Sequence, residues 1–355
     1  MRVLALLLAL LVVACARPLP EGTTELVYAS PYSPGHPFSR ADLRWIEHVE
    51  RESGGSLRIR PVWSGGLLSS EMSMEELRHG VADIGLITPI YVRGGTHLIR
   101  MQSGFYSGAE SIESQVALYR CLERQTPQIG AELHGLKVLA VQGGLIPGVV
   151  TRSQPVRTLE DLKGMRLRAP TELLGVLERL GADPVNMPMG EVYSAMAKGV
   201  IDGVVAPPDT FAALHFAEIA RYYADLAVPR GAYPARAMNL DTWNRLTPEQ
   251  QQVLEGGVAV WEAALAEENH AAADRGLAEA RARGITFSAV SEEDQARFDR
   301  LYLEEAQRNA QALERFDIDG MTTFHLARAS IPAPTRVSPL SWRLPAASTT
   351  ARAPG

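Results

Sequence analysis

The stretch EDLKGMRLRAP, residues 160–170, places three basic side chains within six positions: Lys163, Arg166 and Arg168. Apolar residues alternate with the two arginines, a period of two that is typical of a β-strand, so both arginines are expected on one face. A guanidinium is a planar fork that can hold a carboxylate through two parallel hydrogen bonds. The pattern predicts an arginine that binds an acid, or one that forms an ion pair across the fold, and it does not distinguish Arg166 from Arg168.

Signatures of catalysis are largely missing from the sequence. It has no glycine-rich phosphate loop before a helix and no Gly-x-Ser-x-Gly turn, and no two of its eight histidines have the helical spacing of metal ligands. The formal net charge is −6 without a large basic patch, which disfavours a nucleic acid as partner. The chemistry that these residues indicate is therefore binding, with no cofactor and no metal ligand evident.

The elements before the basic stretch alternate between strands and helices. Strands are predicted at residues 25–30, 56–63, 81–87 and 136–142. Helices are predicted at residues 40–53, capped by Ser39, and at 73–80, capped by Ser73. The order strand–helix–strand–helix–strand is typical of a mainly parallel sheet with helices on its faces.

The same unit restarts at the basic stretch. Residues 164–170, 184–189 and 201–207 are predicted strands, and residues 171–183 and 190–199 are predicted helices. The segments MSMEELRHGVADIGLI and MGEVYSAMAKGVIDGVV repeat one order of helix, glycine, aspartate and buried strand. This repeat predicts two similar α/β lobes, which would bind a ligand between them at the carboxyl ends of their strands.

A long helix is predicted after the second unit. It begins with Thr247 as cap, has Pro248 in its first turn and could continue to Arg283, with a bend at Gly256 and Gly257. At about 1.5 Å per residue it would span roughly 50 Å, enough to cross both lobes. We expect lobe I from residues 24–145 and about 235–260, lobe II from 146–234 and about 261–326, and a disordered, Pro-, Ala- and Ser-rich tail at 327–355.

The N-terminus is typical of a secretory signal at residues 1–16. A basic start precedes an apolar run at residues 3–13, which is too short for a good membrane span, and small residues follow. Ala14-Cys15-Ala16 fits an ordinary signal-peptidase site, whereas Val12 to Cys15 resembles a lipoprotein box. We favour the second reading, in which Cys15 is lipidated, and expect a periplasmic protein that touches a membrane only through this anchor.

Several segments spread along the chain resemble the substrate-binding proteins of tripartite ATP-independent periplasmic (TRAP) transporters, the dicarboxylate- and sialic-acid-binding family. They are YSPGHPFSRADLRWIEHVERESGGSLRIRPVWSGGLLSS, MEELRHGVADIGLITP, PVRTLEDLKGMRLRAP, NMPMGEVYSAMAKGVIDGVVAPP and TWNRLTPEQQQVL. Together they cover roughly residues 26–298, and the third is the most specific. The resemblance implies a two-lobed α/β periplasmic binding protein with a long helix across both lobes.

The resemblance also implies a role for one arginine of the opening stretch. In the family, the last basic residue of this segment points into the cleft and pairs with the ligand carboxylate, and that position is Arg168 here. Arg166 would then be a supporting or exposed residue. The alternation of the strand alone leaves the choice between them open.

The chain departs from the family at places where polar ligand contacts often lie. Many members have a second arginine on the preceding strand, a polar residue at the end of the IDGVV strand, and an aromatic residue before EVY. The corresponding residues here, with two that follow the DIGLI strand, are Gly148, Ala206, Met189, Thr88 and Tyr91. A single arginine with a weakly hydrogen-bonding wall disfavours a heavily hydroxylated ligand. We therefore expect a monocarboxylate with a modest apolar body, such as a 2-oxo or aromatic acid, rather than sialic acid.

Six further residues are weaker candidates for ligand contact, because they lie at strand ends, in loops or at positions that recur in the family: Tyr32, His36, Trp63, Glu191, Asp209 and Asn239. His36 could instead cap a helix, and Trp63 could be an ordinary core residue. Glu191 would pair with an arginine or act as an acid at a helix N-terminus.

The mechanism expected from these features is capture and delivery. A ligand would bridge the lobes on closure, and the closed form would dock on a separate membrane permease. The alternatives are a C4-dicarboxylate or sugar acid as ligand, and a sensor or adaptor role for the same fold. An enzyme using Glu191 or His36 is disfavoured because no nucleophile pairs with a base.

Overall fold

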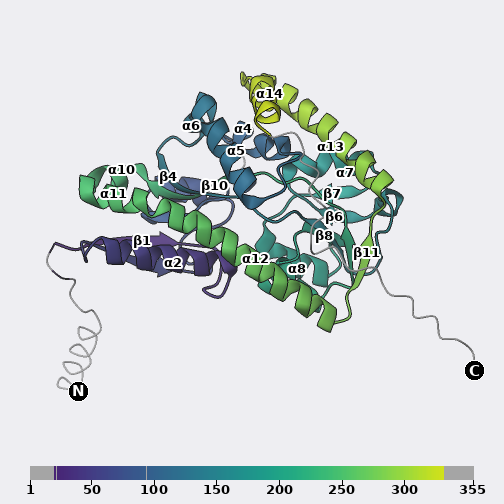
Figure 1. Cartoon of the computed structure of the whole chain (residues 1–355), viewed down its shortest axis with the longest axis horizontal. Coiled ribbons are helices and arrows are strands. Elements are labelled where there is room, and N and C mark those ends of the chain that lie inside the picture. The colour runs from purple at the N-terminus through teal and green to yellow at the C-terminus, as the bar shows by residue number, and fades with distance from the viewer. Residues whose placement is uncertain (1–19, 21, 93, 332–355) are drawn as a thin grey trace, which may run out of the picture.

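The computed structural model describes residues 20, 22–92 and 94–331, and it contains two β-sheets surrounded by helices (Figure 1). The predicted signal at residues 1–16, Cys15 and most of the predicted tail lie outside the described residues. In lobe I the strand order is β2 (Leu57–Val62), β1 (Thr24–Ala29), β3 (Ile84–Leu86), β10 (Tyr233–Asn239) and β4 (Leu136–Gln142). Strands β2, β1 and β3 are parallel, and β10 is antiparallel to both of its neighbours.

The sheet of lobe II repeats this plan. Its order is β7 (Asp183–Val185), β6 (Arg166–Arg168), β8 (Gly203–Ala206), β5 (Gly148–Thr151), β9 (Tyr222–Asp225) and β11 (Thr286–Ala289). Strands β7, β6 and β8 are parallel, and β5 is antiparallel to β8 and β9. The predicted repeat is therefore confirmed, because β3 and β8 occupy corresponding places in the two sheets. The predicted class, a two-lobed α/β protein with mixed, mainly parallel sheets, is also confirmed.

Two short segments pass between the lobes, and two helices, α12 (Val258–Ala282) and α13 (Glu292–Gln311), each pack against both lobes. Residues 143–147 lead from β4 to β5, and residues 226–232 return from β9 to β10. Helix α12 (Val258–Ala282) runs diagonally over both lobes in Figure 1. Its first turns bury Trp261, Ala264 and Leu265 in the core of lobe I, and its end buries Ala280 in the core of lobe II. A helix across both lobes is thus confirmed, although residues 261–265 belong to the packing of lobe I.

The predicted long helix is two helices, α11 (Pro248–Gly256) and α12. Thr247 caps α11 as predicted, and Gln250 completes a capping box with it. The interruption falls at the predicted glycines. The backbone at Gly257 lies against Trp45, since a β-carbon there would be 2.8 Å from the Trp45 Nε1.

Shorter helices flank the sheets. Those of lobe I are α2 (Pro37–Glu52), α3 (Ser73–Arg78), α4 (His97–Gln102), α5 (Ile112–Gln125), α6 (Pro127–Glu132) and α10 (Leu240–Arg245), and those of lobe II are α7 (Leu174–Arg179), α8 (Met189–Ala197) and α9 (Thr210–Ala213). Two predicted caps are wrong. His36, not Ser39, caps α2, since Pro37 can occupy the first turn of a helix. Ser73 lies inside α3 and bonds to Thr88 instead.

The C-terminal helices pack first against lobe II, where Phe298 and Tyr302 of α13 are buried, and then against lobe I. Helix α13 (Glu292–Gln311) is capped by Ser291, and α14 (Gly320–Ser330) continues past residue 326, where the fold was expected to end. The end of α13, the turn that follows and α14 place apolar side chains in the core of lobe I: Ala306, Ala310, Leu313, Phe324 and Ala327. Burial of these residues binds the segment to lobe I, although residues up to 326 were assigned to lobe II.

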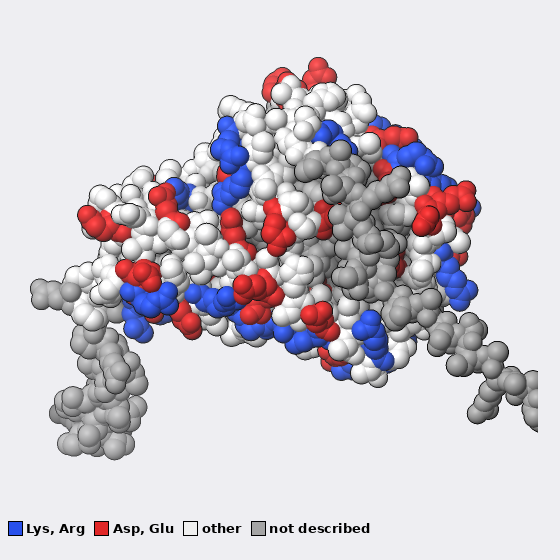
Figure 2. Space-filling model, viewed as in Figure 1, with Lys and Arg blue, Asp and Glu red and all other residues white. Residues whose placement is uncertain are grey.

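The surface visible in Figure 2 carries both signs of charge, interspersed along α2 and α12. Arg40 and Arg44 of α2 pair with Glu268 and Glu267 of α12, with N–O distances of 2.7 and 2.6 Å. These surface pairs lie along the contact between α2 and α12, whose buried part is the stack of Trp45 on Trp261. Among the described residues, none of the helices is both long and apolar enough to span a membrane.

Candidate functional site

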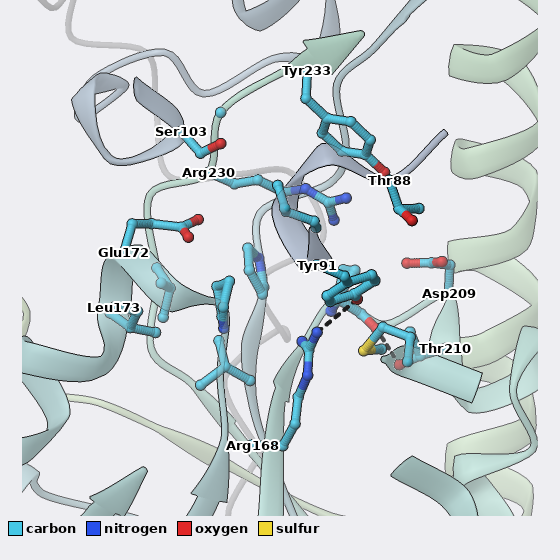
Figure 3. Close-up of a pocket in the computed structure, with 18 of the residues that line it drawn as sticks. Thr88, Tyr91, Ser103, Arg168, Glu172, Leu173, Asp209, Thr210, Arg230 and Tyr233 are labelled. Carbon is cyan, nitrogen blue, oxygen red and sulfur yellow. Dashed lines mark hydrogen bonds between the residues drawn. The ribbon is translucent and has the colours of Figure 1, made fainter. Parts of the chain in front are cut away.

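A cavity lies between the two lobes, where several parallel strands end. Its walls include residues that follow β1, β3, β6 and β8, together with residues of the returning segment 226–232 and of α12. This is the place that the repeat of two lobes predicts for a ligand. The residues drawn in Figure 3 reach it from both lobes.

Arg168 enters the cavity from the carboxyl end of β6. Only 4% of the residue is exposed, and two bonds fix its guanidinium: Nε donates to the carbonyl of Met187 (3.0 Å) and Nη2 donates to the hydroxyl of Tyr91 (2.8 Å). The bond to Tyr91 crosses between the lobes (Figure 3). No hydrogen bond to a described residue uses Nη1. The arginine is thus held in place by two bonds and retains hydrogen-bonding capacity toward the cavity.

Arg166, in contrast to Arg168, lies on the surface of the protein. It begins β6 and is exposed, and its Nε lies 3.7 Å from a carboxylate oxygen of Asp183. Although the two arginines have the same parity, only the one at the strand's carboxyl end reaches the cavity. Position along the strand therefore separates Arg168 from Arg166.

A second arginine lines the cavity, so the expectation of a single arginine is wrong. Arg230 lies in the segment that returns from β9 to β10, between Pro229 and Gly231. No hydrogen bond or ion pair joins its guanidinium to the other described residues. It packs closely over Gly144 of the other connecting segment, where a β-carbon would lie 2.2 Å from the Arg230 Cζ.

Two carboxylates share the cavity with the arginines. Glu172 and Asp209 are 8% and 6% exposed, and each has one oxygen, Oε2 and Oδ1 respectively, that is buried without a hydrogen-bond partner. Burial raises the pKa of Glu172 to about 7, against the opposing effect of Arg168 and Arg230. Burial likewise raises the pKa of Asp209 to about 7, against the opposing effect of Arg230. Asp209 was a predicted candidate with an open role, and Glu172 was missed.

Tyr32 and His36 form one rim of the cavity. Their rings stack with centroids 4.1 Å apart, and His36 Nδ1 accepts a hydrogen bond from the amide of Phe38 (3.2 Å). Burial lowers the pKa of His36 to about 3, and Arg236 and Arg40 act in the same direction. The imidazole is therefore neutral and acts as a helix cap, the alternative role considered for it. Thr88, Tyr91 and Met189 also line the cavity.

Five predicted candidates do not line this cavity: Gly148, Ala206, Trp63, Asn239 and Glu191. Gly148 has no room for a side chain, since a β-carbon would lie 2.4 Å from the carbonyl of Ala224. Ala206 is fully buried in a core cluster of lobe II. Trp63 packs edge-on against Tyr28, which is the core role left open for it.

The remaining two have local structural roles. Asn239 caps α10 by accepting from the amide of Thr242 (2.9 Å), and it donates to the carbonyls of Leu77 and Arg78. Glu191 is exposed in the first turn of α8, where an acid favours the helix dipole. Glu191 therefore has the second of the two roles considered for it, that of an acid at a helix N-terminus.

A buried polar network supports the wall of lobe I. Arg236 of β10 and Asp42 of α2 are fully buried with Nε and Oδ1 2.8 Å apart. Tyr28 donates to Asp42 (2.6 Å), and Trp261 Nε1 donates to it as well (2.8 Å). The network connects β1, β10, α2 and α12, and it was missed because its members are far apart in the sequence. Within the described part of the chain, no group of three or more His, Cys, Asp or Glu residues is arranged to hold a metal ion.

The two similar lobes, the interlobe cavity and the connecting helix define a periplasmic binding protein of the two-lobed class. The model for the bacterial extracellular solute-binding proteins of family 7 matches residues 28–311, most of the chain. The chain therefore belongs to this family, the substrate-binding proteins of TRAP transporters.

Individual relatives agree with this assignment. A monocarboxylate 2-oxoacid-binding periplasmic protein from Nostoc sp. is 26% identical over 211 residues, which are 58% of this chain and 57% of the relative. The matches span 57 to 65% of the first curated relatives.

Solved structures have the same fold. A TRAP periplasmic solute-binding protein from Desulfovibrio salexigens superposes with a TM-score of 0.71 at 26% identity, covering 88% of this chain and 98% of that one. One from Rhodoferax ferrireducens, with copurified benzoate, has a TM-score of 0.78 at 23% identity and covers 87% and 98%. One from Sulfitobacter sp., with bound β-D-galacturonate, has a TM-score of 0.71 at 18% identity and covers 86% and 100%.

Proposed function

We propose that this protein captures a small organic acid in the interlobe cavity and that Arg168 holds the ligand's carboxylate. The observation that carries the proposal is the position of Arg168, a buried arginine at the carboxyl end of β6. Tyr91 and Met187 fix two of its nitrogens and leave Nη1 for a ligand. Because the bond to Tyr91 joins the lobes, a carboxylate on Arg168 would also stabilise their contact.

For the body of the ligand we propose a compact apolar group, as in a 2-oxo or aromatic monocarboxylate. Apolar side chains form much of the wall: Phe38, Ile90, Leu173, Val205, Leu214 and Val228. The 2-oxoacid relative and the benzoate complex of the same fold support this choice. The galacturonate complex shows that a protein of the same fold can also bind a sugar acid. The proposal of an apolar ligand body therefore rests on the apolar side chains that line the cavity of this chain.

Arg230 favours a second candidate, a C4-dicarboxylate or sugar acid whose far end would reach this second guanidinium. The charges around Arg230 oppose a dicarboxylate. Glu172 and Asp209 lie in the same cavity, and a second ligand carboxylate would be repelled by both when they are ionised.

The partner that follows from the family is a TRAP membrane permease, to which the closed protein would deliver its ligand from the periplasm. A sensor or adaptor with the same ligand is the alternative, and a permease gene beside this one would favour transport. Enzymatic activity is not part of the proposal, since the cavity pairs no nucleophile with a base.

A thermal-shift screen of the purified protein against a library of organic acids tests the proposal. A bound acid stabilises the native state by RT ln(1 + [L]/Kd), about 2.7 kcal/mol at a hundred times Kd. We expect a carboxylate to raise the melting temperature of the wild type and of Arg166→Ala, the matched control, but not of Arg168→Ala. A hit that stabilises Arg168→Ala as well would show that Arg168 is structural.

A further inference from the structure

Glu172 and Asp209 have capacity for hydrogen bonds that the protein does not use. Each lines the cavity, each is more than nine-tenths buried, and each has a buried oxygen without a donor among the described residues. A buried acceptor without a partner costs about 1–3 kcal/mol, so an unpaired oxygen in the wall of a ligand cavity can gain a donor from the ligand. The cost is recovered if a ligand brings the missing donor.

The two acids come from different strands of lobe II. Glu172 follows β6 in the short helix Thr171–Leu173, and Asp209 follows β8 before α9. In Figure 3 they reach toward the cavity on either side of Arg230. Arg230 acts electrostatically on both carboxyl groups but bonds to neither.

We propose that Glu172 and Asp209 are specificity-determining residues that accept hydrogen bonds from a hydroxyl or amino group of the ligand. The inference rests on the proposed function, because Arg168 must hold the carboxylate at the other end. It narrows the ligand to a hydroxy- or amino-substituted monocarboxylic acid.

The balance of charge in the cavity supports this class over the neighbouring ones. Two guanidiniums, Arg168 and Arg230, face two carboxyl groups. A dicarboxylate ligand would place a second negative charge beside Glu172 and Asp209. A monocarboxylate without a donor group would exclude water and leave the unpaired oxygens of Glu172 and Asp209 without a hydrogen bond. The carboxylate of a substituted monocarboxylic acid would bind Arg168, and its hydroxyl or amino group would donate a hydrogen bond to Glu172 or Asp209.

Conservative substitutions of the two cavity carboxylates can test this inference. Glu172→Gln and Asp209→Asn keep the shape of each side chain but replace one acceptor oxygen by a donor nitrogen. Glu191→Gln is the matched control, because Glu191 is exposed and lies outside the cavity. None of the three removes Arg168 or Tyr91.

Calorimetry with pairs of acids that differ by one donor tests the inference. The pairs are benzoate with 3-hydroxybenzoate or 3-aminobenzoate, phenylacetate with mandelate, and propionate with lactate. In at least one pair, we expect the substituted acid to bind the wild type about 10-fold more tightly than its parent. Glu172→Gln or Asp209→Asn should reduce that advantage to less than about 3-fold. Glu191→Gln should preserve the advantage.

The outcomes separate this inference from the proposed function. Equal affinity within every pair, with binding that still requires Arg168, would overturn the inference and leave the function in place. An advantage that persists in both cavity variants would also overturn it. Failure of every carboxylate to bind would overturn both.

Discussion

At the residue scale, the account depends on which guanidinium receives the ligand. Arg168 has two protein partners that fix its orientation, and such preorganisation lowers the entropic cost of binding. Arg230 has none among the described residues. Strand alternation could not choose between Arg166 and Arg168, because parity reports the face of a strand and not the distance of a residue from its end.

Other residues of the site could not be predicted from pattern at all. Arg230 lies in a connecting segment, where no periodicity indicates the direction of a side chain. Glu172 lies in a short helical turn and resembles an ordinary surface acid. The one available signal was the position of Arg230 between Pro229 and Gly231, next to a predicted return to lobe I.

Tyr91→Phe should weaken ligand binding by about 10-fold, equivalent to 1.4 kcal/mol. The substitution removes the hydroxyl that accepts from Arg168 Nη2 and retains the ring. Calorimetry with an acid from the screen measures the change. Tyr193→Phe is the control, since its hydroxyl bonds to Glu218 on the surface. Unchanged affinity in Tyr91→Phe would show that this contact does not position Arg168.

Glu172 and Asp209 should make the ligand-free protein less stable as pH rises from about 4 to 8. Because folding raises the pKa of each group to about 7, the native state binds more protons than the unfolded state over this interval. Each group would cost on the order of 3 kcal/mol at pH 8. The groups that act on Glu172 are Arg168, Arg230 and Arg100, and Arg230 acts on Asp209.

Thermal unfolding across this range measures the effect. Glu172→Gln and Asp209→Asn should each raise the melting temperature at pH 8 more than at pH 4. Glu191→Gln should leave the pH profile as it is in the wild type. A variant with the wild-type profile would mean that its carboxyl group titrates normally.

At the element scale, local sequence predicted the start of α11 correctly, whereas the caps predicted at Ser39 and Ser73 were wrong. The box of Thr247 and Gln250 and the cap at Ser291 are contained within four residues. The break after Gly256 could be suspected from two glycines, but its cause is tertiary. Trp45 and Trp261 stack with centroids 3.8 Å apart, and the backbone at Gly257 lies against Trp45.

Gly256→Ala and Gly257→Ala should have opposite effects on stability. At Gly256 a β-carbon meets nothing within 4 Å, so alanine should stabilise α11 by up to about 1 kcal/mol. At Gly257 it would displace Trp45, at a cost of about 1–3 kcal/mol. Urea denaturation compares the two variants directly. Equal effects would show that the break between α11 and α12 does not depend on this contact.

At the scale of the whole molecule, the repeat of two lobes could be read from the sequence, because each lobe repeats one order of elements. The lobe against which the end of α13 and α14 pack could not be predicted in this way. The end of α13 and α14 pack into lobe I through small and apolar residues that lack a distinctive motif. Their lobe depends on shape complementarity between surfaces, which periodicity does not encode.

A ligand that bridges the lobes should make the protein more compact in solution. In the described structure, Arg168 donates a hydrogen bond to the hydroxyl of Tyr91 in the other lobe. A carboxylate bound to Arg168 would reinforce this contact. Small-angle X-ray scattering should show a smaller radius of gyration with saturating acid than without it. Arg168→Ala should show no change. A radius that is the same with and without ligand in the wild type would contradict closure.

The most direct test of the central claim is a crystal structure of the protein with a carboxylate from the screen. The account predicts the ligand's carboxylate within hydrogen-bonding distance of Arg168 Nη1, with Tyr91 and Met187 still bonded to the same guanidinium. A carboxylate bound to Arg230 instead, with Arg168 making only its contacts to Tyr91 and Met187, would contradict it.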